Sequence, residues 1–227
     1  MKQKVGVGVV TTNYRPQIFQ ESIIKTINNS MSEQYDVRFS IVNASVGDSM
    51  LSVAQAKNKN LYELQGCDYI FLFDDDCFPY NIGYINYFID AHLQTKQHHF
   101  LFCKKGLHTF IGRKEYTPKL QTELFTDCGG VFMFLTKSVI QKVGGMKVDY
   151  VQWGYEHAGY SARIHKAGLC DHLYQTLENT DKYIYAKDYE NVIPSNISLQ
   201  QKQDLIAINK PIYEEDCKVI FQPIKFD

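Results

Sequence analysis

The sequence contains no long apolar run and no signal-peptide pattern. A membrane-spanning helix needs about 20 consecutive, mostly apolar residues, and no stretch of this chain approaches that length. The N-terminus leads directly into a strand pattern rather than into a charged segment followed by an apolar one. We therefore expect a cytoplasmic protein without a membrane span.

Paired cysteines and an excess of charge of one sign are also absent. The six cysteines, at positions 67, 77, 103, 128, 170 and 217, are scattered and form no C-x-x-C pair, which predicts free thiols rather than a disulfide framework or a zinc site. The formal net charge is −1, whereas nucleic-acid-binding domains usually carry a basic surface. Nucleic acid is therefore not an expected partner.

The composition is that of one folded domain. Hydrophobic residues make up 44% of the 227 residues, which is too large a share for a disordered chain. The length allows one sizeable core and does not require a second. We predict a single domain over residues 1–227.

Three strand patterns in the first third of the chain predict the fold class. Residues 5–10, 37–42 and 69–73 are rich in apolar, branched or aromatic residues, and each run is followed by a polar loop and a helical pattern. The helical patterns follow Pro16 and cover residues 51–65 and 82–95. Successive units of this kind predict an α/β fold with a Rossmann-like, mostly parallel central sheet flanked by helices, and they bring the polar loops to one edge of the sheet.

The second half of the chain is less regular. We expect strands at residues 100–103, 107–111, 131–135, 170–175 and 182–186, which include a small antiparallel portion, and helices at residues 137–143, 156–167 and 198–209, followed by a terminal strand. The pattern weakens at residues 113–118, where we expect a flexible loop. We find no chemistry in the tail from residue 197 onward.

Three carboxylates, Asp74, Asp75 and Asp76, directly follow the third strand. Ligands bind at the carboxyl ends of the strands in open α/β sheets. Crowded carboxylates repel one another, and a hard cation such as Mn²⁺ or Mg²⁺ relieves the repulsion while keeping coordination positions for phosphate oxygens. The alternative is a solvated acidic turn that caps the next helix.

Further polar residues follow the other strands or lie in the helices. Asn13 and Asn43 follow the first two strands, and their amides can pair with the donors and acceptors of a uracil. Near the middle of the second helix lie Lys57, Asn58, Lys59 and Asn60, which could equally form a solvated face. Glu156 begins the fifth predicted helix, where a carboxylate is favoured by the helix dipole, so it could be a capping residue only.

Together these motifs resemble those of the GT-A glycosyltransferases, in the same order along residues 5–168. The resemblance rests on four motifs: Thr11-Thr12-Asn13-x-Arg15-Pro16, the DxD-like Asp74-Asp75-Asp76, the pair Gly129-Gly130, and Trp153-Gly154-x-Glu156. The last two are similar to those of the β-1,4-galactosyltransferases and the polypeptide N-acetylgalactosaminyltransferases. The resemblance implies a nucleotide-binding half at residues 1–80, a donor-sugar and acceptor half at residues 81–190 and a C-terminal extension at residues 191–227.

The resemblance also implies roles for single residues. Asp76 would be the principal metal ligand, with Asp74 contacting both the metal and the sugar or ribose. Gly129 and Gly130 would let the donor sugar approach the backbone, and Trp153 would stack on a sugar ring. The nucleotide contacts would come from Thr11, Thr12, Asn13, Arg15, Asn43, Lys57, Asn58, Asp74 and Asp75.

Two departures from the family pattern concern the catalytic base and a metal ligand. Family members follow the glutamate with an aspartate that deprotonates the acceptor, whereas this chain has His157 and Ala158. Either Glu156 or His157 would then be the base. We expect Glu156 to be the base or to orient the acceptor, with His157 as the substitute candidate. The family also places a metal-binding histidine on a late strand, and His172 is the candidate, although it comes early.

The resemblance predicts a metal-dependent enzyme that transfers a sugar from a nucleotide-sugar donor, a UDP-sugar, to a hydroxyl of a glycan or other acceptor, with inversion. A sugar-nucleotide nucleotidyltransferase is an alternative, but residues 11–16 lack its Gly-rich basic signature. Gly6 and Gly8 lie within the first strand and no third glycine opens the helix, so a dinucleotide-binding fingerprint is also missing. A nucleotide-sugar-binding module without turnover is the second alternative.

Overall fold

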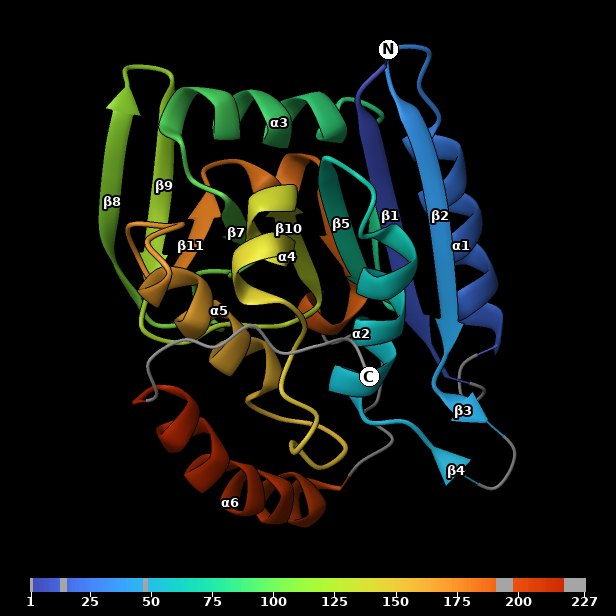
Figure 1. Cartoon of the computed structure of the whole chain (residues 1–227), viewed down its shortest axis with the longest axis vertical. Coiled ribbons are helices and arrows are strands. Elements are labelled where there is room, and N and C mark those ends of the chain that lie inside the picture. Colours follow the sequence, from blue (N-terminus) through green and yellow to red (C-terminus); the bar gives the residue numbers. More distant parts are fainter. Residues whose placement is uncertain (1, 13–15, 47–48, 191–197, 219–227) are drawn as a thin grey trace.

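The computed structural model describes residues 2–12, 16–46, 49–190 and 198–218. Its centre is a five-stranded sheet with the order β2-β1-β5-β10-β7 (Figure 1). β1 pairs in parallel with β2 and β5, and β10 is antiparallel to both β5 and β7. The strands are β1 (Lys4–Thr11), β2 (Asp36–Asn43), β5 (Tyr69–Asp74), β7 (His99–Leu101) and β10 (Phe132–Thr136). The predicted mostly parallel α/β sheet is confirmed.

Helices cover both faces of this sheet. One face carries α1 (Pro16–Ser30) and α3 (Tyr84–Thr95), and the other carries α2 (Val53–Leu64), α4 (Lys137–Val143) and α5 (Glu156–Lys166). Within β5, Phe71 packs edge-on against Tyr84 of α3 at 5.0 Å between ring centroids, whereas Leu72 belongs to the core on the α2 side. β5 is therefore buried on both faces, as its apolar sequence predicted.

Three small sheets and a C-terminal helix complete the fold. β8 (Phe110–Thr117), β9 (Leu120–Phe125) and β11 (Tyr174–Leu177) form an antiparallel sheet with the order β11-β9-β8, which bears out the expected antiparallel portion. Shorter pairs join β6 (Cys77–Pro79) to β12 (Ile184–Ala186) and β3 (Ser45–Val46) to β4 (Ser49–Met50). The remaining elements are the 3₁₀ turns η1 (Thr180–Lys182) and η2 (Lys187–Glu190) and the helix α6 (Leu199–Asp216).

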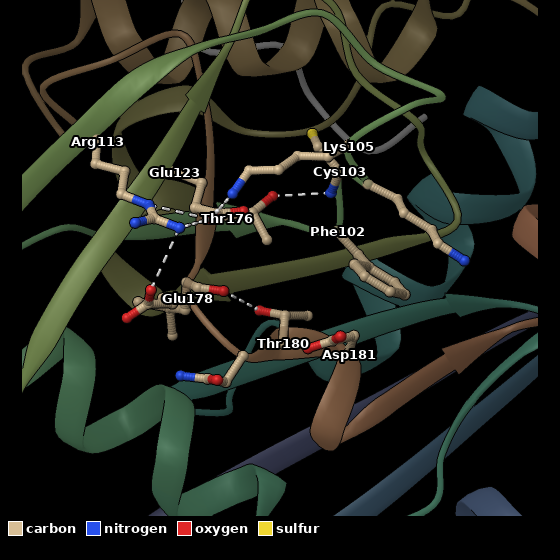
Figure 2. Close-up of a pocket in the computed structure, with 12 residues that line it drawn as sticks. Phe102, Cys103, Lys105, Arg113, Glu123, Thr176, Glu178, Thr180 and Asp181 are labelled. Atoms are coloured by element: carbon tan, nitrogen blue, oxygen red, sulfur yellow. Dashed lines mark hydrogen bonds and ion pairs between the residues drawn. The ribbon is translucent and has the colours of Figure 1, made fainter.

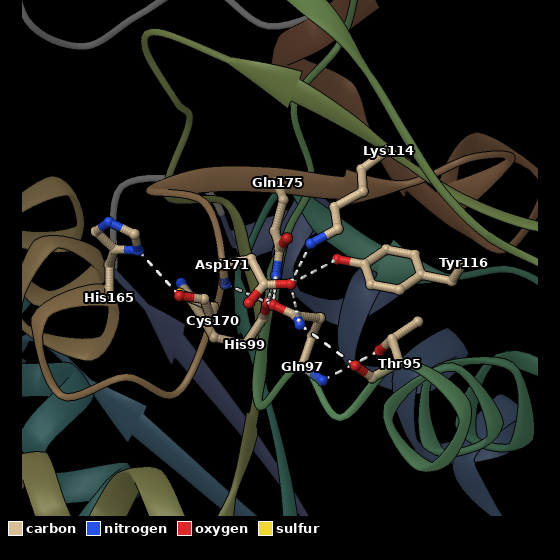
Figure 3. A network of polar contacts seen from close by, with 9 residues as sticks. All are labelled: Thr95, Gln97, His99, Lys114, Tyr116, His165, Cys170, Asp171 and Gln175. Atoms are coloured by element: carbon tan, nitrogen blue, oxygen red, sulfur yellow. Dashed lines mark hydrogen bonds and ion pairs between the residues drawn. The ribbon is translucent and has the colours of Figure 1, made fainter.

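The expected flexible loop at residues 113–118 is wrong, because most of that segment lies within β8. β9 was not predicted either. The side chains of β8 are mostly exposed, so burial gives the strand no apolar alternation. Pairing with β9 and polar contacts hold it instead: Lys114 and Tyr116 both bind the carboxylate of Asp171, which also accepts a hydrogen bond of 2.8 Å from Gln97 (Figure 3).

Several smaller expectations can also be compared. All six cysteines are free thiols, as predicted. No helix within the described ranges is long and apolar enough to cross a membrane. α6 begins with a capping box of Ser198 and Gln201 and continues past the predicted end to Asp216. The expected terminal strand lies outside the described residues.

The first three parallel strands bring their polar ends together. In the register of the sheet, Thr11 of β1 lies opposite Asn43 of β2, and Val10 lies opposite Asp74 of β5. Three segments that are far apart in sequence therefore end at the same edge of the sheet, as predicted. This edge carries the candidate site.

Gly8 allows α2 to pack closely on β1. A Cβ atom at Gly8 would lie 2.7 Å from Cδ2 of Leu72 and 3.0 Å from Cβ of Asn60. The substitution Gly8→Ala should therefore overpack this contact and lower the free energy of unfolding by about 1–3 kcal/mol. Gly66→Ala is the matched control, because no atom lies within 4 Å of a Cβ there. Urea denaturation of both variants checks this, and equal stabilities would contradict it.

Candidate active site

The acidic turn after β5 is largely buried. Asp75 and Asp76 are 8% and 7% exposed, while the side chain of Asp74 is 30% exposed. Burying a carboxylate is costly unless it has partners. A solvated acidic turn is therefore the wrong description of Asp75 and Asp76.

Lys57 of α2 supplies the positive charge beside this turn. Its side chain is 1% exposed, and its Nζ lies 3.0 Å from Oδ1 of Asp74 and donates a hydrogen bond of 2.6 Å to the carbonyl of Gly130. Lys57, Asn58 and Asn60 are buried, so the alternative of a solvated helix face is wrong for them. It holds for Lys59, which is exposed. Lys57 thus joins the acidic turn to the glycine pair.

Asp75 is joined to the end of β1. Its Oδ2 accepts hydrogen bonds from Oγ1 of Thr11 at 3.4 Å and from the backbone N–H of Thr12 at 3.3 Å. The start of the predicted nucleotide loop is therefore fixed to the acidic turn. Asn13 and Arg15, the other predicted residues of this loop, lie outside the described residues.

The two remaining amides predicted to contact the nucleotide differ in position. Asn43 is exposed at the end of β2, and its Oδ1 accepts a hydrogen bond of 2.9 Å from the backbone of Ser45. Asn58 is buried, and its amide exchanges two hydrogen bonds, of 2.7 and 2.8 Å, with the backbone of Met146. Asn58 therefore holds the loop that follows α4, whereas Asn43 lies at the open edge.

The glycine pair admits two aromatic side chains. A Cβ atom at Gly129 would lie 1.9 Å from the hydroxyl oxygen of Tyr189, and one at Gly130 would lie 2.4 Å from Nδ1 of His157. No larger residue fits at either position without displacing these rings. The sequence predicted a close approach to this backbone, and the neighbours that the structure shows are Tyr189 and His157.

Glu156 begins α5 and is 2% exposed. Its Oε2 accepts a hydrogen bond of 2.7 Å from the N–H of Gly154, and its Oε1 lies 3.1 Å from Nδ1 of His157. Burial raises the pKa of Glu156, but the charge and hydrogen bond of His157 and the charge of Lys57 outweigh burial, so its pKa lies below the ordinary value. Glu156 is therefore ionised at neutral pH, and its carboxylate holds the loop before α5 rather than capping the helix, which has no side-chain cap.

These contacts unite three segments in one cluster. Asp74 pairs with Lys57, Lys57 binds the carbonyl of Gly130, the ring of His157 lies against Gly130, and His157 pairs with Glu156. Nε2 of His157 lies 3.3 Å from the carbonyl oxygen of Cys128, just before the glycine pair. The acidic turn, the glycine pair and the start of α5 therefore share one polar network.

α6 contributes a residue that the sequence analysis missed. The Asn209 side chain is fully buried; its Nδ2 donates to the carbonyls of Val151, Trp153 and Gly154 at 2.9–3.0 Å, and its Oδ1 accepts from the N–H of Val151 at 2.8 Å. The expectation that the tail carries no chemistry is thus incomplete, because α6 fixes the loop that presents Trp153. No local pattern marks Asn209, since its partners lie more than 50 positions away.

Trp153 and His172 lie in different surroundings. Trp153 is partly buried, and the Nζ of Lys202 from α6 lies 5.7 Å from the centre of its ring. His172 precedes β11, and its Nε2 lies 3.2 Å from the carbonyl oxygen of Phe125 in β9. Residues 2–12, 16–46, 49–190 and 198–218 contain no group of three or more His, Cys, Asp or Glu side chains placed to hold a metal ion.

The predicted metal ligands Asp74, Asp76 and His172 therefore stay a prediction. The two aspartates do suit a divalent cation, because they offer hard oxygen donors at a strand end. Such an ion commonly takes its remaining ligands from substrate phosphates rather than from the protein.

Lys57 should stabilise the fold as well as the site. In Lys57→Met the carbonyl of Gly130 and the carboxylate of Asp74 lose their buried partner, which should lower the free energy of unfolding by about 1–3 kcal/mol. Lys59→Met, the same substitution at an exposed position of α2, should change stability by less than about 0.5 kcal/mol. Chemical denaturation of both variants measures the difference, and an unchanged Lys57→Met variant would show that the pairing is not formed.

Comparisons of sequence relate the chain to glycosyltransferases. Residues 108–188 match the family model described as the N-terminal domain of galactosyltransferase. An uncharacterised glycosyltransferase of Acanthamoeba polyphaga mimivirus is 27% identical over 136 residues, which cover 58% of this chain and 52% of the viral protein. The chain thus spans about half the length of this relative.

Solved structures share the fold at low sequence identity. β-1,4-Galactosyltransferase 7 of Drosophila, in complex with manganese, UDP-Gal and xylobiose, has a TM-score of 0.51 at 15% identity, over 89% of this chain and 79% of that one. The mannosyltransferase PcManGT of Pyrobaculum calidifontis, with GDP-Man and Mn²⁺, has a TM-score of 0.54 at 13% identity, over 74% and 53%. TarS of S. aureus, in complex with UDP, has a TM-score of 0.53 at 11% identity, over 90% and 70%. The sheet and these neighbours show that the chain has the GT-A fold, and the sequence matches show its similarity to glycosyltransferases.

Proposed function

We propose that this chain is a metal-dependent, inverting glycosyltransferase that moves a sugar from a UDP-sugar to a hydroxyl of a glycan acceptor. The observation that carries the proposal is the buried network from Asp74 through Lys57 and Gly130 to His157 and Glu156. This network connects the end of β5, where a metal and a diphosphate could bind, with the start of α5. The residues at the start of α5 are suited to acid–base chemistry. Both parts serve a metal-dependent, inverting transfer from a nucleotide-sugar.

The acidic turn is the proposed donor end of the site. Asp76 and Asp74 would hold Mn²⁺ or Mg²⁺, which supplies positive charge to the departing diphosphate. The ammonium of Lys57, 3.0 Å from Asp74, adds a fixed positive charge at the same place. Manganese accompanies the nucleotide sugar in the Drosophila and Pyrobaculum neighbours, which supports a metal here.

The edge next to the acidic turn would receive the nucleotide. Thr12 is held there by Asp75, and Asn43 is exposed at the end of the neighbouring strand. An amide can pair with both the donor and the acceptor of a uracil edge. UDP accompanies two of the three neighbours described above, which supports a UDP-sugar over other donors.

The start of α5 is the proposed acceptor end. Oε1 of Glu156 lies 3.1 Å from Nδ1 of His157, and the lowered pKa of Glu156 makes its carboxylate a weak proton acceptor. We therefore assign Glu156 the role of orienting His157, and His157 the role of the base that takes the acceptor proton. An imidazole is chemically competent for this near neutral pH. Trp153 would offer its ring to the acceptor sugar.

Removing one metal ligand should abolish metal-dependent turnover. Asp76→Ala leaves the diphosphate charge uncompensated, so donor hydrolysis and transfer should fall by about 10²-fold or more. EDTA should have the same effect on the unchanged protein, with recovery on adding Mn²⁺. Asp36→Ala, at the opposite and exposed end of β2, is the control and should keep full activity. EDTA-resistant turnover would contradict the metal assignment, and a chain that binds UDP without any turnover would be a binding module.

The two candidate bases can be separated kinetically. His157→Gln should lower kcat for transfer by about 10²- to 10⁴-fold and leave UDP affinity unchanged, because the base acts only on the acceptor. Glu156→Gln should cost less, since it removes the partner of the base but not the base itself. A larger loss of kcat in Glu156→Gln than in His157→Gln would make Glu156 the base. A product with the anomeric configuration of the donor, seen by NMR, would exclude inversion.

A further inference from the structure

A cavity of about 380 Å³ lies next to the site but outside the network described above (Figure 2). Its walls come from residues 102–105 after β7, from the β8-β9 hairpin, and from residues 176–181. The volume falls within the range of about 300–1,000 Å³ that is usual for small-molecule sites. The cavity opens to solvent, because the side chains of Lys105 and Arg113 are 43% and 48% exposed.

The charged side chains of the cavity form a connected set. The guanidinium of Arg113 lies 3.2 Å from Oε1 of Glu123 and 3.6 Å from Oε1 of Glu178, and Lys105 pairs with the same oxygen of Glu123. Figure 2 shows Arg113 between the two glutamates, which come from β9 and from the end of β11. The arrangement holds donors and acceptors in fixed positions on facing walls.

These charges balance. The lining contains three cations, Lys104, Lys105 and Arg113, and three carboxylates, Glu123, Glu178 and Asp181. A balanced set has no net attraction for an anionic or a cationic ligand. A neutral polyhydroxylated ligand can pair with both kinds of group, because each hydroxyl both donates and accepts a hydrogen bond. Phe102 and Leu177 add apolar surface against which the C–H groups of a sugar can pack.

Two aromatic side chains connect the cavity to the glycine pair. The hydroxyl of Tyr189 donates a hydrogen bond of 2.7 Å to the carbonyl of Phe102, and the same hydroxyl lies against Gly129. Nδ1 of His108 accepts a hydrogen bond of 3.0 Å from the N–H of Lys104, and Nε2 of His108 would lie 3.2 Å from a Cβ atom at Gly129. Tyr189 and His108 therefore link the backbone of two residues that line the cavity, Phe102 and Lys104, to the glycine pair.

We infer that this cavity is a saccharide subsite that holds the part of an oligosaccharide acceptor beyond the reacting sugar. That the bound saccharide is the acceptor rests on the proposed function. That the ligand is a neutral saccharide rests on the cavity alone. It makes the substrate a neutral glycan of several units rather than a single sugar or a charged molecule. Arg113 and Glu178 are the residues that would bind its hydroxyls.

Saturation-transfer NMR on the whole chain with UDP and Mg²⁺ tests this inference directly. The probes are xylotetraose, cellotetraose, maltotetraose and chitotetraose, with the matching monosaccharides for comparison. At least one tetrasaccharide should bind and its monosaccharide should bind much more weakly. Arg113→Gln and Glu178→Gln should each weaken that binding about tenfold or more, because each removes a charge-assisted hydrogen bond.

Arg38→Gln and Glu33→Gln are the matched controls, since both side chains are exposed and neither lines the cavity. Neither control should change saccharide binding, and none of the four variants should change UDP binding. The inference is overturned if no tetrasaccharide binds while UDP does, if the cavity variants bind like the unchanged chain, or if inorganic phosphate displaces the saccharide. Saccharide binding that is lost in the cavity variants of a chain without turnover would support the subsite and contradict the proposed enzyme.

Discussion

The buried ammonium of Lys57 is the interaction on which the rest of the site depends. A charge placed in the low dielectric of a protein interior must be paired and hydrogen-bonded, and Lys57 satisfies this with Asp74 and the carbonyl of Gly130. These contacts connect α2 to the C-terminal end of β5, at Asp74, and to the segment before β10, at Gly130. The close contact of α2 with β1 at Gly8 brings the ammonium to this depth.

From Lys57 the contacts continue to the start of α5. Gly130 has no side chain, so the ring of His157 lies against its backbone, and Glu156 then holds that ring. The loop before Glu156 is in turn held by Asn209 from the far end of the chain. The positions of Gly130, Glu156 and His157 therefore rely on α2, from the first third of the chain, and on α6, from its last part.

The sequence predicted the parts of this structure that depend on local patterns. β1 and β5 are continuous apolar runs with polar ends, and β2 alternates apolar with polar residues, so the positions of these strands and the edge carrying Asp74 followed from their patterns and directions. β8 and β9 did not follow, because the exposed side chains of β8 leave no apolar alternation and pairing alone defines the strand. The burial of Lys57 and the position of Asn209 also could not be predicted, since Gly130, which accepts from Lys57, and the partners of Asn209 lie more than 50 positions away.

A crystal structure of the chain with UDP and Mn²⁺ tests the central claim most directly. The account predicts anomalous density for manganese bound by Asp76 and Asp74, with the diphosphate beside Lys57 and the uracil next to Asn43 at the ends of β1 and β2. Density that also connects His172 to the manganese would confirm the full ligand set predicted from the sequence. Manganese or UDP bound away from the acidic turn, with Lys57 remote from any phosphate, would contradict the account.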